Sequence, residues 1–319
     1  MDSKKNKQEL VIESTESVKK KKVLKITLLT LFIIFLLIFA YGIFLLLRVG
    51  NIISSSYLEI EQENLRAAPL ELGEDPFSLL VLGIDQPDLA RPGHSDAIML
   101  MTFNPEKEST YILSLARDKY IDVTGHGVYF NRLGFQYTLG GAAASVDALQ
   151  RTLNLPVDYF VVVDMLGFSS LIDEIGGITI NNTLEFSVED YDFPIGPIDL
   201  DGSQALSFVR MRMDDPDGDF GRQERQRAVA ETTLRSLARV ALLRHHAIIN
   251  ILGDSLQTNL TSSDLLTIFW NYRGALEHIE LLELRGTSEL IDDVHFHVVP
   301  DEQILEMSEH LKGHLELDN

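Results

Sequence analysis

The longest apolar stretch of the chain runs from Ile26 to Leu47 and holds 22 residues without a charged side chain. A helix of that length spans roughly the 30 Å hydrocarbon core of a bilayer, whereas the apolar core of a signal peptide is about 7–15 residues long. Five lysines lie between positions 19 and 25, and the positive-inside rule places such a flank in the cytoplasm. The sequence therefore predicts a single-pass signal-anchor protein of the cell membrane, with a basic cytoplasmic tail (1–25), a transmembrane helix (26–47), a stalk (48–75) and an extracellular domain (76–319).

Charge is distributed unevenly along the chain. The formal net charge is −21, although residues 1–48 carry nine basic and only four acidic side chains. The remaining residues are therefore strongly acidic, and we expect no binding of nucleic acid, because polyanions are recognised by basic surfaces. The chain contains no cysteine, which excludes disulfides, thiolate nucleophiles and cysteine–zinc sites.

Short apolar runs bounded by turn residues alternate with amphipathic segments after residue 76. The runs predict buried strands, and the amphipathic segments predict helices. Because the strands come in groups with helices between the groups, we expect an α/β protein of the mixed α+β kind, in which helices flank a central mixed β-sheet. The predicted strands are Phe77–Ile84, Ala97–Phe103, Thr110–Leu115, Val157–Met165, Ile178–Ile180 and Val294–Val299, and the predicted helices are Ala142–Leu153, Phe168–Ile175, Arg222–Leu243, Ser263–His278 and Asp301–Leu311.

Two arginines, Arg210 and Arg212, stand two positions apart in the apolar run LSFVRMRM. That spacing predicts a strand with both side chains on one face, which Leu206 and Phe208 share. Guanidinium groups beside apolar side chains suit a ligand with a phosphate head and an apolar tail, because arginine pairs bidentately with phosphate oxygens.

Further polar residues follow this run after an Asp/Pro/Gly-rich turn, Asp214–Asp219. Arg222, Arg225 and Gln226 stand three and four positions apart, which predicts one stripe of a helix. The turn lacks the glutamate of an EF-hand loop, so we interpret its acids as turn formers, with Asp219 orienting the nearby arginines. A solvated helix face laced with ion pairs is the alternative interpretation of the same pattern.

Two aspartates stand at the ends of neighbouring predicted strands: Asp85 follows the first strand, and Asp96 precedes the second. Carboxylates at adjacent strand ends can share a hard cation such as Mg²⁺ or Mn²⁺, whose coordination is often completed by substrate phosphates. The alternative is that both residues only cap turns. Arg117 and Asp118 follow the third strand at a similar position, where such a pair is commonly a surface ion pair.

An ordered set of motifs extends over residues 76–319: LLVLGID, HSDAIMLMTFNP, ILSLARD, LDGSQALSFVRMRMDDPDGDFGRQERQR and VHFHVVPDEQIL. In their order and spacing they resemble the LytR–CpsA–Psr family of membrane-anchored bacterial phosphotransferases. The resemblance implies a Mg²⁺-assisted enzyme that moves a glycopolymer, with one phosphate, from a polyprenyl-pyrophosphate carrier onto a peptidoglycan acceptor. It also implies an apolar pocket for the isoprenoid tail.

The resemblance further implies roles for individual residues. Asp85 and Asp96 match the magnesium-associated aspartates of the family. With the three arginines Arg117, Arg210 and Arg212 they form the predicted catalytic set. The predicted substrate-binding set comprises Arg222, Gln226, Asp219, His94 and Arg225.

The chain departs from the family pattern at two positions. His94 stands where the family commonly has arginine, and Phe130 where it commonly has lysine. Each change removes a permanent positive charge near the expected head group. Two alternatives to a transferase therefore stay open: a weakly catalytic or non-catalytic module that binds polyprenyl phosphates, and a polyprenyl pyrophosphatase.

Overall fold

The computed structural model describes residues 36, 56–61, 63, 65–85, 93–121, 131–213, 215–239 and 256–317. The predicted tail, almost all of the predicted transmembrane helix, and Phe130 lie outside the described residues. Within the part that is described, no helix is long and apolar enough to cross a membrane. Residues 52–319 form one compact unit.

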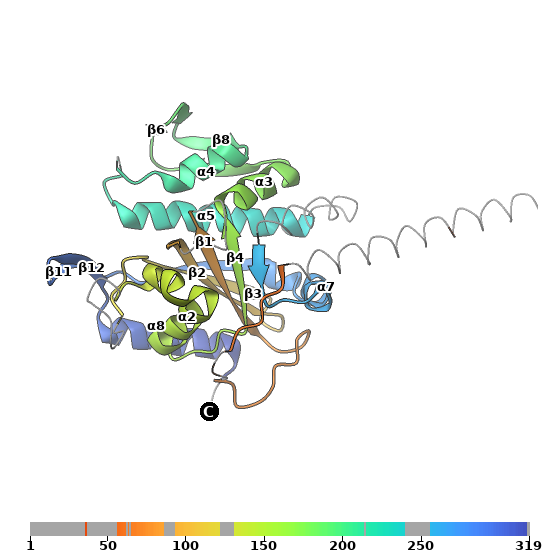
Figure 1. The fold of residues 1–319 in the computed structure, drawn as a ribbon. Coiled ribbons are helices and arrows are strands. Elements are labelled where there is room, and N and C mark those ends of the chain that lie inside the picture. The colour runs from red at the N-terminus through yellow and green to blue at the C-terminus, as the bar shows by residue number, and fades with distance from the viewer. Residues whose placement is uncertain are drawn as a thin grey trace, which may run out of the picture. The chain divides into compact units, whose positions relative to one another are not determined.

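Six strands form the central sheet in the order β10-β3-β2-β1-β4-β9 (Figure 1). The strand β1 pairs in antiparallel fashion with β2 and in parallel with β4, so the sheet is mixed, as the sequence predicts. The strand bounds are β1 (Phe77–Ile84), β2 (Ser95–Asn104), β3 (Ser109–Leu115), β4 (Tyr159–Asp164), β9 (Leu256–Thr258) and β10 (His278–Glu283).

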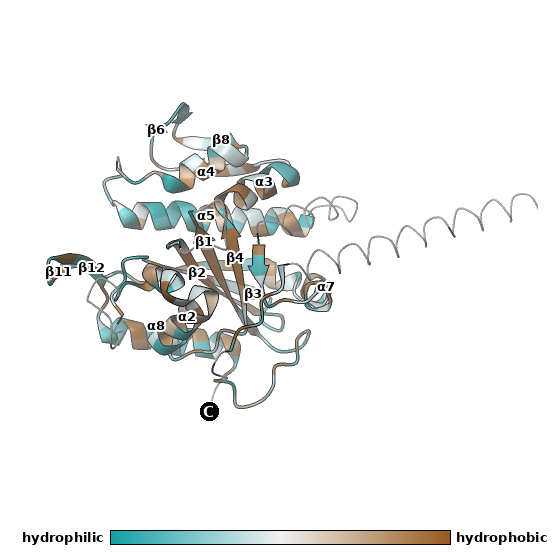
Figure 2. Ribbon diagram, viewed as in Figure 1, coloured by the Kyte–Doolittle hydropathy of each residue, from teal (hydrophilic) through white to brown (hydrophobic). Residues whose placement is uncertain are grey.

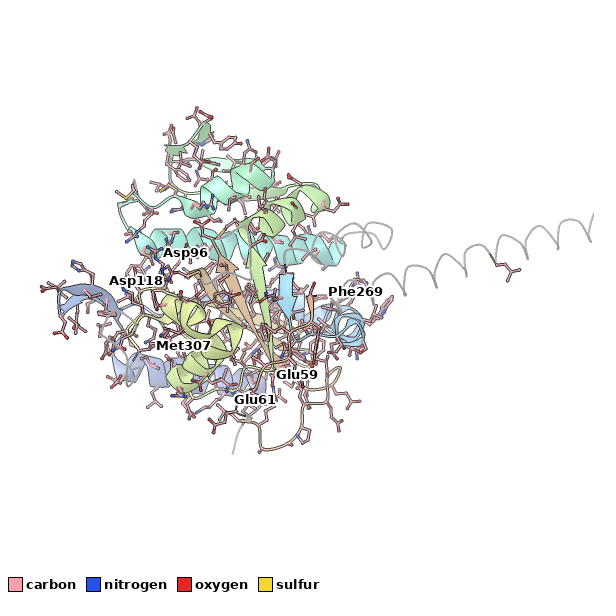
Figure 3. The ribbon with its side chains drawn as sticks, in the orientation of Figure 1. Glu59, Glu61, Asp96, Asp118, Phe269 and Met307 are labelled. Atoms are coloured by element: carbon pink, nitrogen blue, oxygen red, sulfur yellow. The ribbon has the colours of Figure 1, made fainter. Side chains whose placement is uncertain are left out.

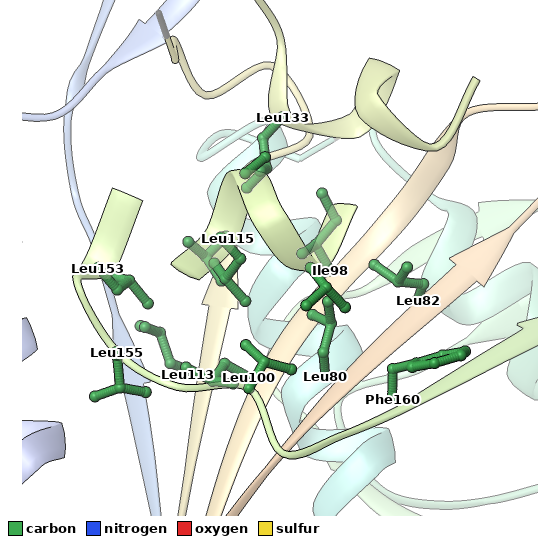
Figure 4. Packing of buried hydrophobic residues seen from close by; sticks show 14 of the residues in the cluster. Leu80, Leu82, Ile98, Leu100, Leu113, Leu115, Leu133, Leu153, Leu155 and Phe160 are labelled. Atoms are coloured by element: carbon green, nitrogen blue, oxygen red, sulfur yellow. The ribbon is translucent and has the colours of Figure 1, made fainter. Parts of the chain in front are cut away.

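One face of the sheet packs on helices α2 (Gln136–Leu153) and α8 (Asp301–Leu315). Side chains alternate along a strand, so Leu80 and Leu82 of β1 both enter this core. Figure 4 shows part of the cluster, in which Leu80, Leu100 and Leu113 of three adjacent strands lie side by side. These residues are fully or almost fully buried, and their burial supplies the main hydrophobic stabilisation of this layer.

The opposite face of the sheet lies toward helix α5 (Asp219–Arg239), with helix α7 (Ser262–Asn271) at one side. Figure 2 colours β1, β2 and β4 as hydrophobic, whereas α5 carries hydrophilic residues along much of its length. On this face Leu79 and Val81 are only partly buried. The incomplete burial indicates open space between the sheet and α5.

A smaller layer lies on the other side of α5 (Figure 1). Its core brings together Phe186, Phe193 and Phe208, whose ring centroids are 4.8–5.5 Å apart. Its elements are α3 (Met165–Ile175), α4 (Gly202–Arg210), β5 (Ile178–Asn182), β6 (Phe186–Val188), β7 (Tyr191–Phe193) and β8 (Gly196–Leu200).

The remaining described elements lie outside this layer. They are the hairpin of β11 (Thr287–Ile291) and β12 (Val294–Val298) and the 3-10 helices η2 (Leu133–Phe135) and η3 (Gly274–Leu276).

The strand predicted around Arg210 and Arg212 is wrong. Residues 202–210 form the helix α4, of which Arg210 is the last residue. The helix begins at a capping box in which Asp201 and Gln204 satisfy each other's backbone groups. Its apolar side chains then recur at spacings of three and four rather than two, so the two arginines do not share a strand face.

Several element boundaries also differ from the predictions, for example α2, which begins at Gln136 instead of Ala142. The predicted helix Ser263–His278 ends at Asn271, because Tyr272 is buried and its hydroxyl donates to the backbone oxygen of Asp75. The chain then turns into the edge strand β10, which pairs in parallel with β3. Near the end of the predicted stalk, Arg66 forms an ion pair with Asp158, so this part of the segment packs onto the body.

Candidate active site at the mouth of an apolar cavity

A cavity of about 610 Å³ lies between the sheet and α5. Strands β1, β2 and β4 form its floor, and α3 and α5 form its walls. Apolar side chains dominate the lining; among them are Leu79, Val81, Met99, Val161, Phe168 and Val229. A space of this size and character suits an apolar ligand rather than water alone.

One face of α5 lines the cavity along most of the helix. Arg222 and Gln226 lie near its beginning, and Val229, Ala230, Leu234 and Leu237 continue the same stripe. These positions follow helical spacing, and from Arg222 to Leu237 the helix extends roughly 22 Å. A single helix face therefore presents polar groups at one end and an apolar wall beyond them. Of the predicted stripe of Arg222, Arg225 and Gln226, Arg222 and Gln226 lie on this face and Arg225 does not.

The two aspartates lie at the same end of two neighbouring central strands, β1 and β2. In the antiparallel pair of β1 and β2, Ile84 stands opposite Ser95. This register brings Asp85 and Asp96 to neighbouring strand ends, and both line the cavity. The structure thus places them as the strand-end interpretation requires.

Each aspartate holds an arginine. The Nη2 atom of Arg210 donates to Oδ1 of Asp85 at 2.5 Å, and Nη1 of Arg117 donates to Oδ1 of Asp96 at 2.5 Å. Figure 3 labels Asp96 near α5, at the end of the sheet where Asp118 also lies. Burial opposes the charge of Arg117, but its hydrogen bond to Asp96 and the surrounding carboxylates outweigh burial and raise its pKa.

A third arginine is buried at the beginning of α5. Arg222 lies 2.5 Å from Oδ1 of Asp219, and Nε of Arg212 lies 4.0 Å from the same oxygen. Burial lowers the pKa of Arg222, Asp219 opposes that shift, and the positive charge of Arg117 adds to it. Arg117, Arg210 and Arg222 line this end of the cavity, whereas Arg212 lies beside Asp219 without lining it.

Two of these guanidinium groups have unsatisfied donors. Among the described residues, the buried Nε atoms of Arg117 and Arg222 have no hydrogen-bond partner. Buried polar groups in native proteins are nearly always paired, so such donors beside a cavity point to a ligand with oxygen acceptors. Both arginines line the cavity.

Two predicted site residues lie elsewhere. Arg225 faces the loop between α4 and α5, where it donates to the backbone oxygens of Phe208 and Met211 and pairs with Asp215 at 2.5 Å. It is buried and holds that loop in place. The side chain of His94 lies 3.1 Å from the Thr138 hydroxyl and does not line the apolar cavity.

The sequence reasoning left out residues around His94. A second, smaller cavity of about 120 Å³ lies there, and Asp118 and Arg132 are part of its wall together with Arg117. The position of Asp118 directly after Arg117 was the available signal. No comparable signal marked Arg132, because it is not adjacent to Arg117 and Asp118 in the sequence and reaches the second cavity only in the fold.

The donor set for a divalent cation consists of two carboxylates. The described residues contain no group of three or more His, Asp or Glu side chains that could enclose a metal. Mg²⁺ commonly takes only one or two carboxylates and completes its shell with water and substrate phosphates. Asp85 and Asp96 therefore fit a Mg²⁺ that binds together with a phosphate ligand.

Solved structures share this fold. The crystal structure of TagU from Bacillus subtilis is 34% identical, with a TM-score of 0.61, and the match covers 76% of this chain and 97% of that one. A structure of TagT bound to LIIa-WTA is 25% identical, with a TM-score of 0.68 and coverage of 80% and 97%. The sequence model of the LytR_cpsA_psr family matches residues 50–313. The chain belongs to this family.

Curated relatives within the LytR_cpsA_psr family carry a functional name. A protein of Enterococcus faecalis is 38% identical over 245 residues, which cover 76% of this chain and 80% of the relative. One of Bacillus subtilis is 35% identical over 278 residues, covering 86% and 90%. Both are named polyisoprenyl-teichoic acid–peptidoglycan teichoic acid transferase TagU. The family resemblance inferred from the motifs is confirmed.

Proposed function

We propose that this protein transfers a glycopolymer, with one phosphate, from a polyprenyl-pyrophosphate carrier onto a hydroxyl group of peptidoglycan. The observation that carries the proposal is the arrangement of three arginines, Arg117, Arg210 and Arg222, at the mouth of an apolar cavity. The buried Nε donors of Arg117 and Arg222 are unsatisfied. The names of the TagU relatives and the TagT complex with a wall teichoic acid precursor support the same substrate class.

Two regions of the cavity bind two different parts of the carrier. The isoprenoid tail occupies the apolar space along α5, where burial of its surface contributes about 25 cal/mol per Å². The diphosphate lies at the polar end, within reach of Arg117, Arg210 and Arg222. Their permanent charges pair with the phosphate oxygens in a partly dry site, where such contacts are stronger than in water.

The reaction is a phosphoryl transfer. The acceptor hydroxyl oxygen forms a bond to the phosphorus that carries the glycopolymer, and the bond from that phosphorus to the bridging oxygen breaks. Polyprenyl phosphate leaves with the bridging oxygen, and the hydroxyl proton passes to a carboxylate at the mouth, Asp85 or Asp96. No nucleotide is required, because the diphosphate bond supplies the driving force. Positioning and charge stabilisation by the arginines account for most of the catalysis.

Asp85 and Asp96 would hold Mg²⁺ in this scheme. A cation held there would supply neutralising charge to the diphosphate and to the leaving phosphate. Both aspartates already face guanidinium groups, so binding of the donor redistributes these pairs: the arginines turn to phosphate oxygens and the carboxylates become available. The membrane anchor predicted at 26–47 would keep the catalytic domain outside the cell and close to its lipid-linked donor.

A transfer assay with the purified full-length chain tests the proposal. The protein in vesicles receives a polyprenyl-pyrophosphate-linked saccharide labelled on the sugar, Mg²⁺ and peptidoglycan. We expect label on the peptidoglycan and stoichiometric polyprenyl monophosphate. Release of phosphate at a rate independent of acceptor would instead identify a pyrophosphatase. Tight binding of the donor without any release would identify a binding module.

A further inference from the structure

The second cavity lies against the proposed diphosphate site. Its volume is about 120 Å³, several times what one water molecule needs. Charged and aromatic side chains form its wall: His94, Arg117, Asp118, Arg132 and Phe135. Arg117 also lines the large apolar cavity, so one guanidinium borders both spaces. Among the residues described, the proposed mechanism assigns no role to this polar space.

Backbone contacts fix one side of the second cavity. The amide of Gly134, in η2, donates to the backbone oxygen of Arg117 at 2.8 Å, and the Ser95 hydroxyl donates to the Gly134 oxygen at 3.3 Å. A Cβ atom at Gly134 would lie 2.6 Å from the backbone oxygen of Ser95. Only glycine allows so close an approach, and it ties η2 to the strand ends that carry Asp96 and Arg117.

Charged groups of both signs line the second cavity. Asp118 lies between two guanidinium groups, with its oxygens 3.7 Å from Nε of Arg117 and 3.5 Å from Nε of Arg132. Both distances exceed a direct hydrogen bond. Arg132 is oriented by the backbone oxygen of His295 at 3.0 Å and by the ring of Phe296. The carboxylate of Asp118 and the guanidinium groups thus present acceptors and donors to a small polar ligand.

An aromatic surface completes the second cavity. The rings of His94 and Phe135 lie 4.7 Å apart, and Thr138 orients His94 from behind at 3.1 Å. The two ring planes are tilted by 39°, and ring carbons next to charged donors and acceptors suit a sugar ring with its hydroxyl groups better than an apolar chain.

We infer that this second cavity binds the acceptor sugar of the transfer reaction, and the inference rests on the proposed function. A two-substrate transfer requires the acceptor hydroxyl beside the donor phosphorus. A sugar seated between His94 and Arg132 presents a hydroxyl to Arg117 and Asp96, at the point where the two cavities meet. Arg132, Asp118 and His94 then act as positioning residues for the acceptor, while Arg210 and Arg222 bind the donor.

Steady-state kinetics of the full-length protein in vesicles separate these roles. The probe for the second cavity is a soluble, uncrosslinked peptidoglycan glycan fragment, titrated at saturating lipid-linked donor, and the donor is then titrated at saturating fragment. We expect Arg132→Gln and His94→Ala each to raise the KM for the fragment about tenfold or more and to leave the KM for the donor within about twofold. Arg151→Gln, at an arginine exposed on α2 and remote from both cavities, is the matched control.

Two readouts keep the outcomes distinct. His94 is exposed, so its variant retains the fold even if Arg132→Gln loosens the contact with His295. Labelled acceptor with an unchanged KM for the fragment in both variants would overturn the acceptor subsite and leave the proposed function intact. A raised KM for the donor instead would assign the second cavity to the donor. Wild-type protein that consumes donor without labelling any acceptor would overturn the proposed function, and the subsite with it.

Discussion

Asp85 and Arg210 are 125 residues apart in the chain, yet their side chains meet at 2.5 Å across the mouth of the apolar cavity. Both remain substantially exposed, with side-chain accessibilities of 52% and 40%. Exposed ion pairs contribute little to stability, commonly about 0–1 kcal/mol. The pair is therefore better explained by the ligand that would occupy the cavity mouth than by folding.

Replacement of Arg210 separates these two explanations. We expect Arg210→Ala to lower the rate of glycopolymer transfer by roughly a hundredfold or more, because a charge-assisted contact to the diphosphate is lost in the transition state. The unfolding free energy should change by no more than about 1 kcal/mol. Transfer rates and chemical denaturation measure the two effects. Near-normal transfer in the variant would remove Arg210 from the site.

Removal of metal tests the two strand-end carboxylates. Chelation by EDTA should abolish transfer, and added Mg²⁺ or Mn²⁺ should restore it. Asp85→Asn should require roughly tenfold more Mg²⁺ for half-maximal rate, because a neutral amide is a weaker ligand for a hard cation. Asp147→Asn, on the exposed face of α2, is the control. Transfer that persists in EDTA would contradict the assignment of Asp85 and Asp96 to a cation.

For a buried ion pair, in contrast to the exposed pair of Asp85 and Arg210, we expect substitution to cause a large loss of stability. Asp158 accepts from Nε of Arg66 at 2.5 Å, from its Nη2 at 2.7 Å and from the Ser78 amide at 2.8 Å, and both charged side chains are about nine-tenths buried. Asp158→Ala removes the buried carboxylate that accepts from Arg66 and from the Ser78 amide, which should cost about 3–5 kcal/mol. Urea denaturation measures this loss. The exposed pair of Arg151 and Asp147 offers the comparison, since Asp147→Ala should cost only about 0.5 kcal/mol.

His314 should make stability sensitive to acid. Burial is the main cause that lowers its pKa from 6.5 to about 4, and nearby Lys107 and His310 add to the shift. Its ring nitrogens contact the hydroxyls of Thr102 and Ser109 at 2.7 and 2.9 Å. The folded state therefore favours neutral histidine, so this contribution to stability is complete above pH 6.5 and is lost as the pH falls toward 4.

The size of this effect follows from the shift. Protonation should remove up to about 3 kcal/mol between these pH values, at 1.4 kcal/mol per pKa unit. Unfolding free energies at pH 7 and pH 4.5 measure the loss, and His314→Gln should show a smaller decrease over the same interval. Equal acid sensitivity of the two proteins would show that other groups control it.

The strands around the site could be predicted from local sequence. The run Phe77–Ile84 is apolar and ends at turn residues, and β1 has those bounds in the structure. The adjacency of Asp85 and Asp96 follows once the hairpin of β1 and β2 is recognised. By contrast, β10 was not predicted, and its first residue, His278, was assigned to the end of a helix. The sequence HIELLE becomes a strand only by pairing with β3, far away in the chain.

The helix α4 was predicted wrongly for a different reason. Its apolar run fits a strand as well as a helix, and the deciding signal was the capping box of Asp201 and Gln204 several residues earlier. The contacts of Arg225 and His94 could not be predicted from the sequence. Both depend on which neighbour a long or aromatic side chain meets: Asp215 for the first, and Thr138 and Phe135 for the second.

The cavity beneath α5 has a consequence for the life of the protein in the cell. Protein interiors are normally packed as densely as organic crystals, whereas here about 610 Å³ between helix and sheet is left for a ligand. A carrier lipid that binds only the folded form raises its stability in proportion to the logarithm of lipid concentration. A cell short of loaded carrier would then hold this protein in its least stable form and degrade it faster, so supply of the donor would set the abundance of the enzyme that consumes it.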